Sequence, residues 1–433
     1  MDDSRTAVAV ARIEPGYREA IDGVFQALGG IGALVGTERR ILIKPNAVAF
    51  NPEHFTSIEF LEALFSYLRD YGYTKLALME NTTNGAFTRL VFAATGYFGI
   101  CRRFGVKPVL LDEEPYIPLK LPGETKPINF PKILMEEVLE GSAFYLNCPK
   151  FKTHSMTVLT LGVKNQQGLL DDRDKMFEHH HQGLHRRLAR IYKAIRPHFC
   201  LVDAKVALRY GHFPAKANLA DAVVPCGVVF GGPDTVAVDV VGARILGYTL
   251  DEVEHLRICN TDGLGQGDLT EIDIIGELPE LPDKPLPYQI LRRFPDNLRI
   301  VAGKEMACTE GCRGNTEVFI EYLAGDFRGK GGFSFICGKG ISDEELEGLP
   351  KGPILVVGPC AVQESLPRLE KLYPRRKIRV VNEHNDLAKM ATQVKRLMGV
   401  STLRMSPLSI PSSLYHLGVA RIKGSRSRIP SLI

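Results

Sequence analysis

The chain has 433 residues, of which 45% are hydrophobic, and its formal net charge is +4. This length and apolar content are enough for two or three domains with substantial cores. The small net charge argues against a nucleic-acid-binding protein. We also expect no membrane partner, because no window of about 18 uninterrupted apolar residues is present.

The amino-terminal residues lack a positive segment followed by an apolar run, so we expect no secretory signal and a cytoplasmic location. The cysteines number nine, and this odd count makes a disulfide framework a poor explanation for them. Five are scattered singly and are expected to pack as small apolar side chains. They are Cys101, Cys148, Cys200, Cys226 and Cys259.

Short apolar runs alternate with helical patterns over the first 280 residues. Helices are predicted at 17–34 and 57–71. The predicted strands are 6–12, 40–44, 75–79, 106–111, 143–146, 199–202 and 226–230. Strands of this length, each followed by a helix, favour a mostly parallel sheet with helices on both faces. We therefore expect an α/β domain over residues 1–280.

A proline-rich stretch at 276–287 marks a domain edge. Beyond it, further short strands and helices predict a second, smaller α/β domain over residues 290–400. Its predicted strands are 298–302, 332–336, 354–357 and 378–381, and its predicted helices are 315–323, 364–372 and 386–398. Residues 401–433 are expected to form an irregular basic tail.

Polar residues follow several predicted strands of the first domain at the point where each strand ends. Such positions meet at the carboxyl edge of a parallel sheet, where binding sites form. We therefore expect them to converge on one crevice. They are Lys44, Asn46, Glu80, the segment 147–154 and Asp203.

The segment 147–168 concentrates lysines in otherwise apolar sequence. Lysines are rarely buried unless they are paired with negative groups. Read as a helix from Ser155, the segment places a polar stripe on one face, which suggests the wall of a cavity. The stripe comprises Thr157, Thr160, Lys164 and Gln167. An amphipathic surface helix with solvated lysines is the alternative.

We expect this crevice to bind a small anionic substrate. The predicted substrate-binding residues are Lys44, Asn46, Glu80, Lys150, Lys152 and Asn165. His154, Lys164 and Asp203 are the predicted catalytic residues, with His154 kept neutral by the neighbouring lysines. A solvent-facing Lys44 and a helix-capping Glu80 are the alternatives for those two side chains.

The four late cysteines fall near the carboxyl ends of the second domain's predicted strands. They are Cys308, Cys312, Cys337 and Cys360. Thiolates gathered at one sheet edge suit an iron–sulfur cluster, expected to be 4Fe–4S, with zinc as the alternative. A redox thiol and inert buried cysteines are the other interpretations. A separate metal site at His179–His181 with nearby aspartates is less favoured than a solvated loop, because adjacent residues do not share a helix face.

An ordered series of motifs resembles the family known as domain of unknown function 362, over about residues 5–280. The motifs are Ile43–Asn46, Pro149–His154, Val163–Asn165 with Gly168, Leu201–Ala204, Gly232–Asp234 through Asp239, and Gly263–Asp268. The resemblance implies an association with iron–sulfur clusters, which members commonly carry on an appended ferredoxin-like segment. Residues 290–433 have a different cysteine arrangement. The family's activity is largely undefined.

Three functions follow as hypotheses. The first is a cytoplasmic iron–sulfur oxidoreductase that acts on a small anionic substrate and receives electrons from a transfer protein. The second is a non-redox isomerase or transferase whose cysteines are structural or bind zinc. The third is an accessory protein that delivers a cluster or metal. The oligomeric state is left open.

Overall fold

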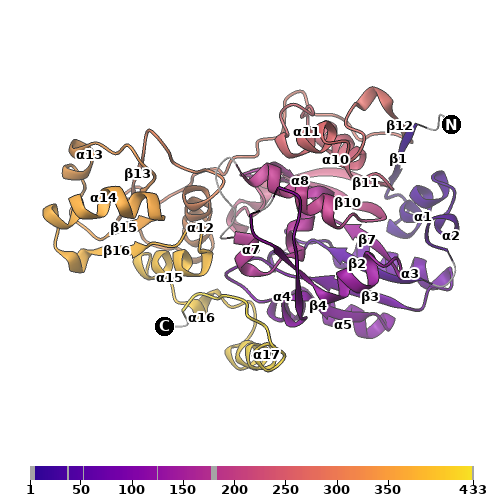
Figure 1. Ribbon diagram of the computed structural model, residues 1–433, viewed down its shortest axis with the longest axis horizontal. Helices are drawn as coiled ribbons and strands as arrows, with labels where there is room; N and C mark the ends of the chain where they lie inside the picture. The colour runs from indigo at the N-terminus through magenta and orange to yellow at the C-terminus, as the bar shows by residue number, and fades with distance from the viewer. Residues whose placement is uncertain (1–4, 37–38, 52, 124, 177–182, 432–433) are drawn as a thin grey trace.

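The computed structural model describes residues 5–36, 39–51, 53–123, 125–176 and 183–431. Within these ranges the chain forms a ten-stranded sheet, a four-stranded sheet and a two-stranded pair, with helices packed around them (Figure 1). The predicted α/β class is confirmed, with a large mostly parallel sheet and a second, smaller parallel sheet. Each helix in the described ranges is too short or too polar to cross a lipid bilayer.

The large sheet has the order β12-β1-β11-β10-β7-β2-β3-β4, and β8 and β9 extend it from β10. The neighbours from β10 to β4 are parallel, whereas β11 runs antiparallel to both β1 and β10. The strands are β1 (Thr6–Arg12), β2 (Arg40–Pro45), β3 (Leu76–Glu80), β4 (Lys107–Leu110), β7 (Ala143–Cys148), β8 (Lys150–His154), β9 (Val158–Thr160), β10 (Phe199–Leu208), β11 (Val223–Gly232) and β12 (Ile272–Ile275).

Apolar side chains alternate between the two faces of this sheet, because successive residues of a strand point in opposite directions. Ile41 and Ile43 of β2 belong to one core, while Leu42 belongs to another on the opposite face. The helices of the first face are α1 (Tyr17–Ala27), α2 (Ile31–Val35), α3 (Ile58–Asp70), α4 (Thr88–Thr95) and α5 (Tyr97–Phe104).

The opposite face carries α6 (Gly162–Asn165), α8 (Leu184–Ala194), α10 (Thr235–Ile245) and α11 (Glu254–Thr261), together with the antiparallel pair β5 (Tyr116–Leu119) and β6 (Ile128–Pro131). Two further short helices of this unit are α7 (Asp172–Met176) and α9 (Leu219–Ala222). Helices on both sides leave the carboxyl edge of the parallel strands as the place for a site.

The smaller sheet is parallel throughout, with the order β13-β14-β15-β16. Its strands are β13 (Arg299–Ala302), β14 (Ser334–Cys337), β15 (Ile354–Val357) and β16 (Ile378–Val381). Its helices are α12 (Cys312–Phe327), α13 (Asp343–Glu347), α14 (Pro359–Leu372) and α15 (Leu387–Leu397). In Figure 1 this unit lies to the left of the large sheet, with α12 and α15 nearest to it. The division into domains 1–280 and 290–400 stays a prediction.

Two expectations about local structure were wrong. The segment from Ser155 does not form one helix, because β8 turns back through 155–157 into antiparallel β9, and only Gly162–Asn165 is α-helical. The strand pairing with β10 outweighs the local helical pattern. The tail is also not irregular, since it contains α16 (Thr402–Met405) and α17 (Ile410–Ile422).

The residues after α17 return to the first unit. The hydroxyls of Ser425 and Ser427 both donate to Asp112 Oδ2, at 2.6 and 2.9 Å. The Arg428 N–H donates to Asp172 Oδ2, and its guanidinium donates to Asp386 beside α15. The segment 425–430 therefore connects the two units as a strap.

Candidate functional site

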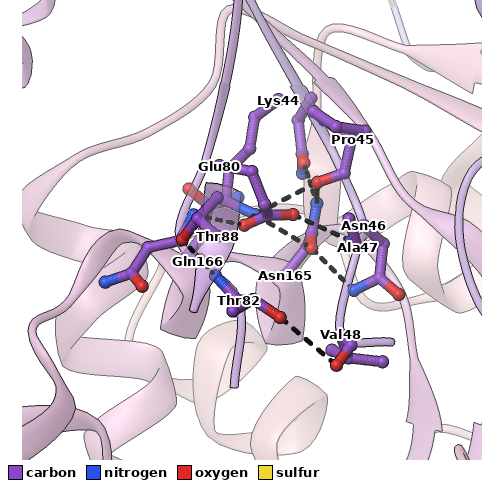
Figure 2. A network of polar contacts seen from close by, with 12 residues as sticks. Lys44, Pro45, Asn46, Ala47, Val48, Glu80, Thr82, Thr88, Asn165 and Gln166 are labelled. Atoms are coloured by element: carbon purple, nitrogen blue, oxygen red, sulfur yellow. Dashed lines mark hydrogen bonds and ion pairs between the residues drawn. The ribbon is translucent and has the colours of Figure 1, made fainter. Parts of the chain in front are cut away.

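Lys44 and Glu80 form a buried ion pair at the ends of β2 and β3 (Figure 2). Lys44 Nζ lies 2.9 Å from Glu80 Oε1 and 3.1 Å from Asn165 Oδ1. Glu80 Oε2 accepts the Ala47 N–H at 2.9 Å. Burial lowers the pKa of Lys44, and the Glu80 carboxylate offsets part of that effect. Because each charge has close polar partners, this pair holds the strand ends in place.

Asn165 joins this pair to the neighbouring strand. Its Oδ1 also accepts from Asn46 Nδ2 at 3.0 Å, and its Nδ2 donates to Asn147 Oδ1 at 2.8 Å. Gly168 lies directly against the pair, since a Cβ there would be 2.7 Å from Glu80 Oε1 and 2.8 Å from Lys44 Nζ. Any larger residue at this position would therefore displace the ion pair.

The short helix α6 is oriented by a buried carboxylate of α10. Asp239 accepts the N–H groups of Gly162 and Val163, at 2.7 and 2.8 Å. Burial raises the pKa of Asp239 to about 8. A side chain at Gly162 would clash with Thr235 at 2.3 Å. This packing sets the direction in which Lys164 leaves the helix.

Lys150 and Asp203 make a second buried pair on β8 and β10. Asp203 accepts from Tyr17 Oη at 2.7 Å and from the Ser57 N–H at 2.8 Å, and Lys150 Nζ is 3.4 Å away. Burial alone would raise the pKa of Asp203, but Lys150 and these donors hold it below its ordinary value. Burial would lower the pKa of Lys150, but Asp203 and Glu53 raise it above its ordinary value. This pair also connects elements rather than facing open space.

A cavity of about 230 Å³ opens beside these pairs. Six predicted site residues line it, whereas Lys44, Lys150 and Asp203 lie behind its wall. The six are Asn46, Glu80, Lys152, His154, Lys164 and Asn165. The crevice expected at the strand ends is thus present, and the roles of these residues stay predictions.

Lys152 and Lys164 differ from the two paired lysines. Lys152 Nζ donates to the His54 carbonyl at 2.7 Å, and Lys164 Nζ contacts the Gln167 amide oxygen. Neither has a carboxylate within 4.0 Å among the described residues. Burial, and then Lys150 and Lys164, lower the pKa of Lys152 well below its ordinary value. Burial, Lys175 and Lys44 lower the pKa of Lys164 to about 7.

Two further polar groups of the wall were missed in the sequence. Lys175 of α7 is buried and donates to the Asn81 carbonyl at 3.1 Å, with Asp172 at 4.0 Å. Burial lowers its pKa, and Asp172 partly offsets this. His212 stacks on His154 with ring centroids 4.0 Å apart. The i,i+3 spacing of Asp172 and Lys175 was the available signal for the first.

The opposite wall comes from the second unit. It is formed by α12, α15 and α16, and Pro430 of the strap completes it. Asn315, which lies one turn into α12, also lines the cavity. Its Nδ2 donates to Asn385 Oδ1 at 2.7 Å. The cavity therefore lies between the two units.

The four late cysteines gather at the carboxyl edge of the smaller sheet, as expected. Burial raises the pKa of Cys312 to about 12, with smaller contributions from Cys360 and Cys308. Burial also raises the pKa of Cys337. Arg313 lowers this pKa, whereas Cys312 and Cys360 raise it further. The mutual influence of these thiols indicates that they are neighbours.

Their surroundings suit a sulfur-ligated group. Cys312 Sγ accepts the Asn385 N–H at 3.2 Å, and Gly358 separates Cys312 from Cys360, since its Cβ would lie 3.2 and 3.7 Å from the two sulfurs. Soft thiols, a backbone donor and a close glycine fit a cluster. Within the described ranges, however, no three His, Cys, Asp or Glu side chains have the spacing to hold a single metal ion. The iron–sulfur cluster and the zinc alternative both stay predictions.

The glycine-rich segment 263–268 packs against the start of α10, where Asp234 accepts the Gln266 N–H at 2.8 Å, so it serves as a turn. His179–His181 lie outside the described residues. The singly placed cysteines of the first unit behave as expected, because Cys101, Cys148, Cys200 and Cys259 are buried, while Cys226 is half-buried.

The fold and cavity define an α/β protein with a lysine-rich internal site between two units. Comparison with known proteins agrees with the motif series: residues 41–244 match the family described as "Domain of unknown function (DUF362)". The resemblance to this family is therefore shown. The matched segment contains Lys152 and Lys164, whereas α12, α15 and α16 lie outside it.

One curated relative is a thylakoid-associated protein of Synechocystis sp. (strain ATCC 27184 / PCC 6803 / Kazusa). It is 25% identical over 231 residues, which cover 52% of this chain and 68% of the relative. No solved structure matches the chain significantly.

Proposed function

We propose that the protein is an enzyme that binds a small anionic substrate in this cavity and performs redox chemistry with an iron–sulfur cluster on the adjacent sheet edge. One observation carries the proposal: among the described residues, Lys152 and Lys164 meet the cavity with neutral oxygens as hydrogen-bond partners and with no carboxylate within 4.0 Å. A buried ammonium that lacks a counter-charge is costly. A carboxylate or phosphate would supply that charge and would raise the lysine pKa values on binding.

The residues of the first unit have distinct roles in this proposal. Lys152 and Lys164 bind the anion, and the Lys44–Glu80 pair with Asn165 fixes the strand ends around it. His154 would move a proton at the substrate, and its Nδ1 accepts the Met156 N–H at 3.1 Å. Asp203 acts at a distance through Lys150 and β8.

The cluster would be held by Cys308, Cys312, Cys337 and Cys360. When bound, it would supply single electrons obtained from an electron-transfer protein. Asn385 supports the connection to the cavity, because it donates to Cys312 Sγ from its backbone and to the Met176 carbonyl from its side chain, at 3.2 and 3.4 Å. Met176 lines the cavity.

Iron and labile sulfide analysis of anaerobically purified, full-length protein tests this proposal. We expect both elements in the wild type and in Cys226→Ser, a half-buried cysteine of β11 that serves as the control. Cys312→Ser and Cys360→Ser should lose them. Protein that holds no iron and no sulfide after reconstitution would end the redox version.

A second candidate is a non-redox isomerase, which the lowered pKa of Lys164 favours. An amine with a pKa of about 7 exchanges protons readily at neutral pH. Metal-free protein would then catalyse the exchange of the α-protons of small carboxylates for deuterium in D₂O, which proton NMR can follow. Lys164→Met should abolish the exchange, whereas Cys312→Ser should leave it unchanged. Exchange that requires the cysteines would contradict this candidate.

We also keep the cytoplasm as the proposed compartment. The name of the Synechocystis relative, which is thylakoid-associated, supplies the alternative of a membrane-bound fraction. Fractionation of cells that express the full chain distinguishes the two, because a cytoplasmic protein stays in the supernatant at both low and high salt.

A further inference from the structure

The cavity has two chemically different walls. The first carries the lysines, and the second is mostly apolar. The apolar wall includes Phe213, which follows β10, and side chains from three helices of the second unit. These are Val318 and Phe319 of α12, Leu387 and Met390 of α15, and Met405 of α16.

Several of these apolar side chains are packed on one side and open on the other. Phe213, Phe319, Leu387 and Met405 are half-buried and pack against the core of the second unit. Since each also lines the cavity, its remaining surface faces the space between the units. A small polar anion would leave that apolar surface in contact with water, which is unfavourable.

The two walls meet at Phe213. The centroid of its ring lies 4.8 Å from that of the Tyr322 ring of α12 and 5.0 Å from that of the His54 ring. The carbonyl of the same His54 accepts from Lys152 Nζ at 2.7 Å. A ligand whose anionic end reaches Lys152 therefore has its other end beside the aromatic wall.

The volume agrees with a ligand of modest size. An apolar cavity of about 150 Å³ holds one benzene molecule. The space here is about 230 Å³, so it would hold one ring or a short alkyl chain together with an anionic head group.

We infer that the substrate is an amphipathic anion, with a carboxylate or phosphate on Lys152 and Lys164 and an aromatic or short aliphatic body against Phe213, Phe319 and Leu387. This inference rests on the proposed anion-binding function and names the substrate class. It also gives the second unit a part in the site, since the α12, α15 and α16 side chains of the apolar wall lie outside the matched segment 41–244.

Calorimetric titration of the full-length protein with charge-matched probe pairs tests this assignment. The pairs are phenyl phosphate with methyl phosphate, and hexanoate with acetate. We expect the larger member of each pair to bind at least about tenfold more tightly, because burying several apolar carbons contributes more than the free energy of one tenfold step. Equal affinities within both pairs would overturn the inference.

Variants of the apolar wall locate the preference. Phe319→Gln should reduce the affinity ratio within each pair to about two or less, and Phe319→Leu should retain most of the ratio. Leu387→Gln provides the same test from α15 if the first variant does not fold. A ratio that survives both polar variants would place the ligand elsewhere and contradict the inference.

Lys164→Met separates this inference from the proposed function. If both members of a pair bind equally and Lys164→Met weakens both, the anion site stands and the substrate class is wrong. If no probe binds, or if binding is independent of Lys164 and Lys152, the anion site itself is wrong.

Discussion

Two pairs of lysines at the crevice differ in their partners, and the contrast separates framework from binding site. Lys44 and Lys150 each contact a carboxylate, Glu80 and Asp203 respectively, and neither lines the cavity. Lys152 and Lys164 contact neutral oxygens and do line it. The four residues lie close together on neighbouring elements, so their sequence positions alone do not distinguish them.

The difference teaches that the counter-charge, rather than burial, indicates the role. A lysine that already has a buried carboxylate partner gains little from an external anion. Removing that lysine leaves the carboxylate buried without a counter-charge. A lysine with neutral partners favours an incoming anion. Breaking a pair of the first kind should therefore destabilise the fold, whereas removing a lysine of the second kind should mainly weaken anion binding.

The largest effect is expected for Glu80→Gln. This change leaves Lys44 without its carboxylate in a fully buried position, and breaking a buried pair from one side costs about 3–5 kcal/mol. The free energy of unfolding, measured by denaturant titration, should fall by that amount. The double variant Lys44→Met/Glu80→Gln should recover part of the loss. A loss below about 1 kcal/mol would place this pair outside the framework.

Gly168→Ala should produce the next largest loss. The added Cβ would lie 2.7 Å from Glu80 Oε1 and 2.8 Å from Lys44 Nζ, so the pair must move. Overpacking of this kind costs about 1–3 kcal/mol. Gly99→Ala is the matched control, because Gly99 lies within α5 with no atom within 4 Å of the new Cβ. It should be neutral or slightly stabilising. Equal effects of the two variants would contradict the role assigned to Gly168.

The pH dependence of stability should reveal Lys164. Its pKa is about 7 in the folded protein and 10.5 ordinarily, so between these values the unfolded chain binds more protons than the folded one. The free energy of unfolding should therefore rise with pH across this window, by up to about 1.4 kcal/mol per pH unit for one proton. Below pH 7 this contribution to the slope disappears.

Lys164→Met isolates that contribution. The free energy of unfolding of the wild type minus that of Lys164→Met should increase as the pH rises from 7 to 10. Below pH 7 this difference should stay constant. Lys150→Met is the contrasting variant. Lys150 has a raised pKa in the folded protein, so it contributes nothing to the pH dependence of the free energy of unfolding in this window. A flat difference for Lys164→Met throughout would mean that Lys164 already has a counter-charge.

The smallest effect on stability is expected for Lys152→Met. The change removes a costly buried charge and also the donor to the His54 carbonyl, and the two effects oppose each other. We expect the free energy of unfolding to change by less than about 1 kcal/mol, while anion affinity falls at least tenfold. A destabilisation as large as that of Glu80→Gln would assign Lys152 to the framework.

Much of the fold could be predicted because its strands are short apolar runs. The predicted strand 6–12 coincides with β1, and 354–357 and 378–381 coincide with β15 and β16. The segment after Ser155 could not be predicted locally. The spacing of its polar residues fits a helix. Pairing of β8 with β10 and β9, however, supplies backbone hydrogen bonds that the local pattern does not encode.

The polar half of the site was predictable and the apolar half was not. Strand-end positions indicate Lys44, Glu80 and the 147–154 segment, because the carboxyl ends of parallel strands meet at one edge. Nothing near Phe319 or Leu387 in the sequence indicates that they line the same cavity as Lys152. That arrangement depends on how two units pack across more than 150 residues, and such long-range packing has no local signature.

The strap at 425–430 has a consequence for how the protein is made. Ribosomes add about 5–20 residues per second, so residues 41–244 are synthesised roughly 10–40 s before Pro430. Pro430 lines the cavity, and Ser425, Ser427 and Arg428 fasten the strap to Asp112 and Asp172. During that interval Pro430 is absent from the cavity wall and the contacts of the strap to Asp112 and Asp172 are not yet made. A ligand that binds the lysines during translation would therefore enter before the strap is in place.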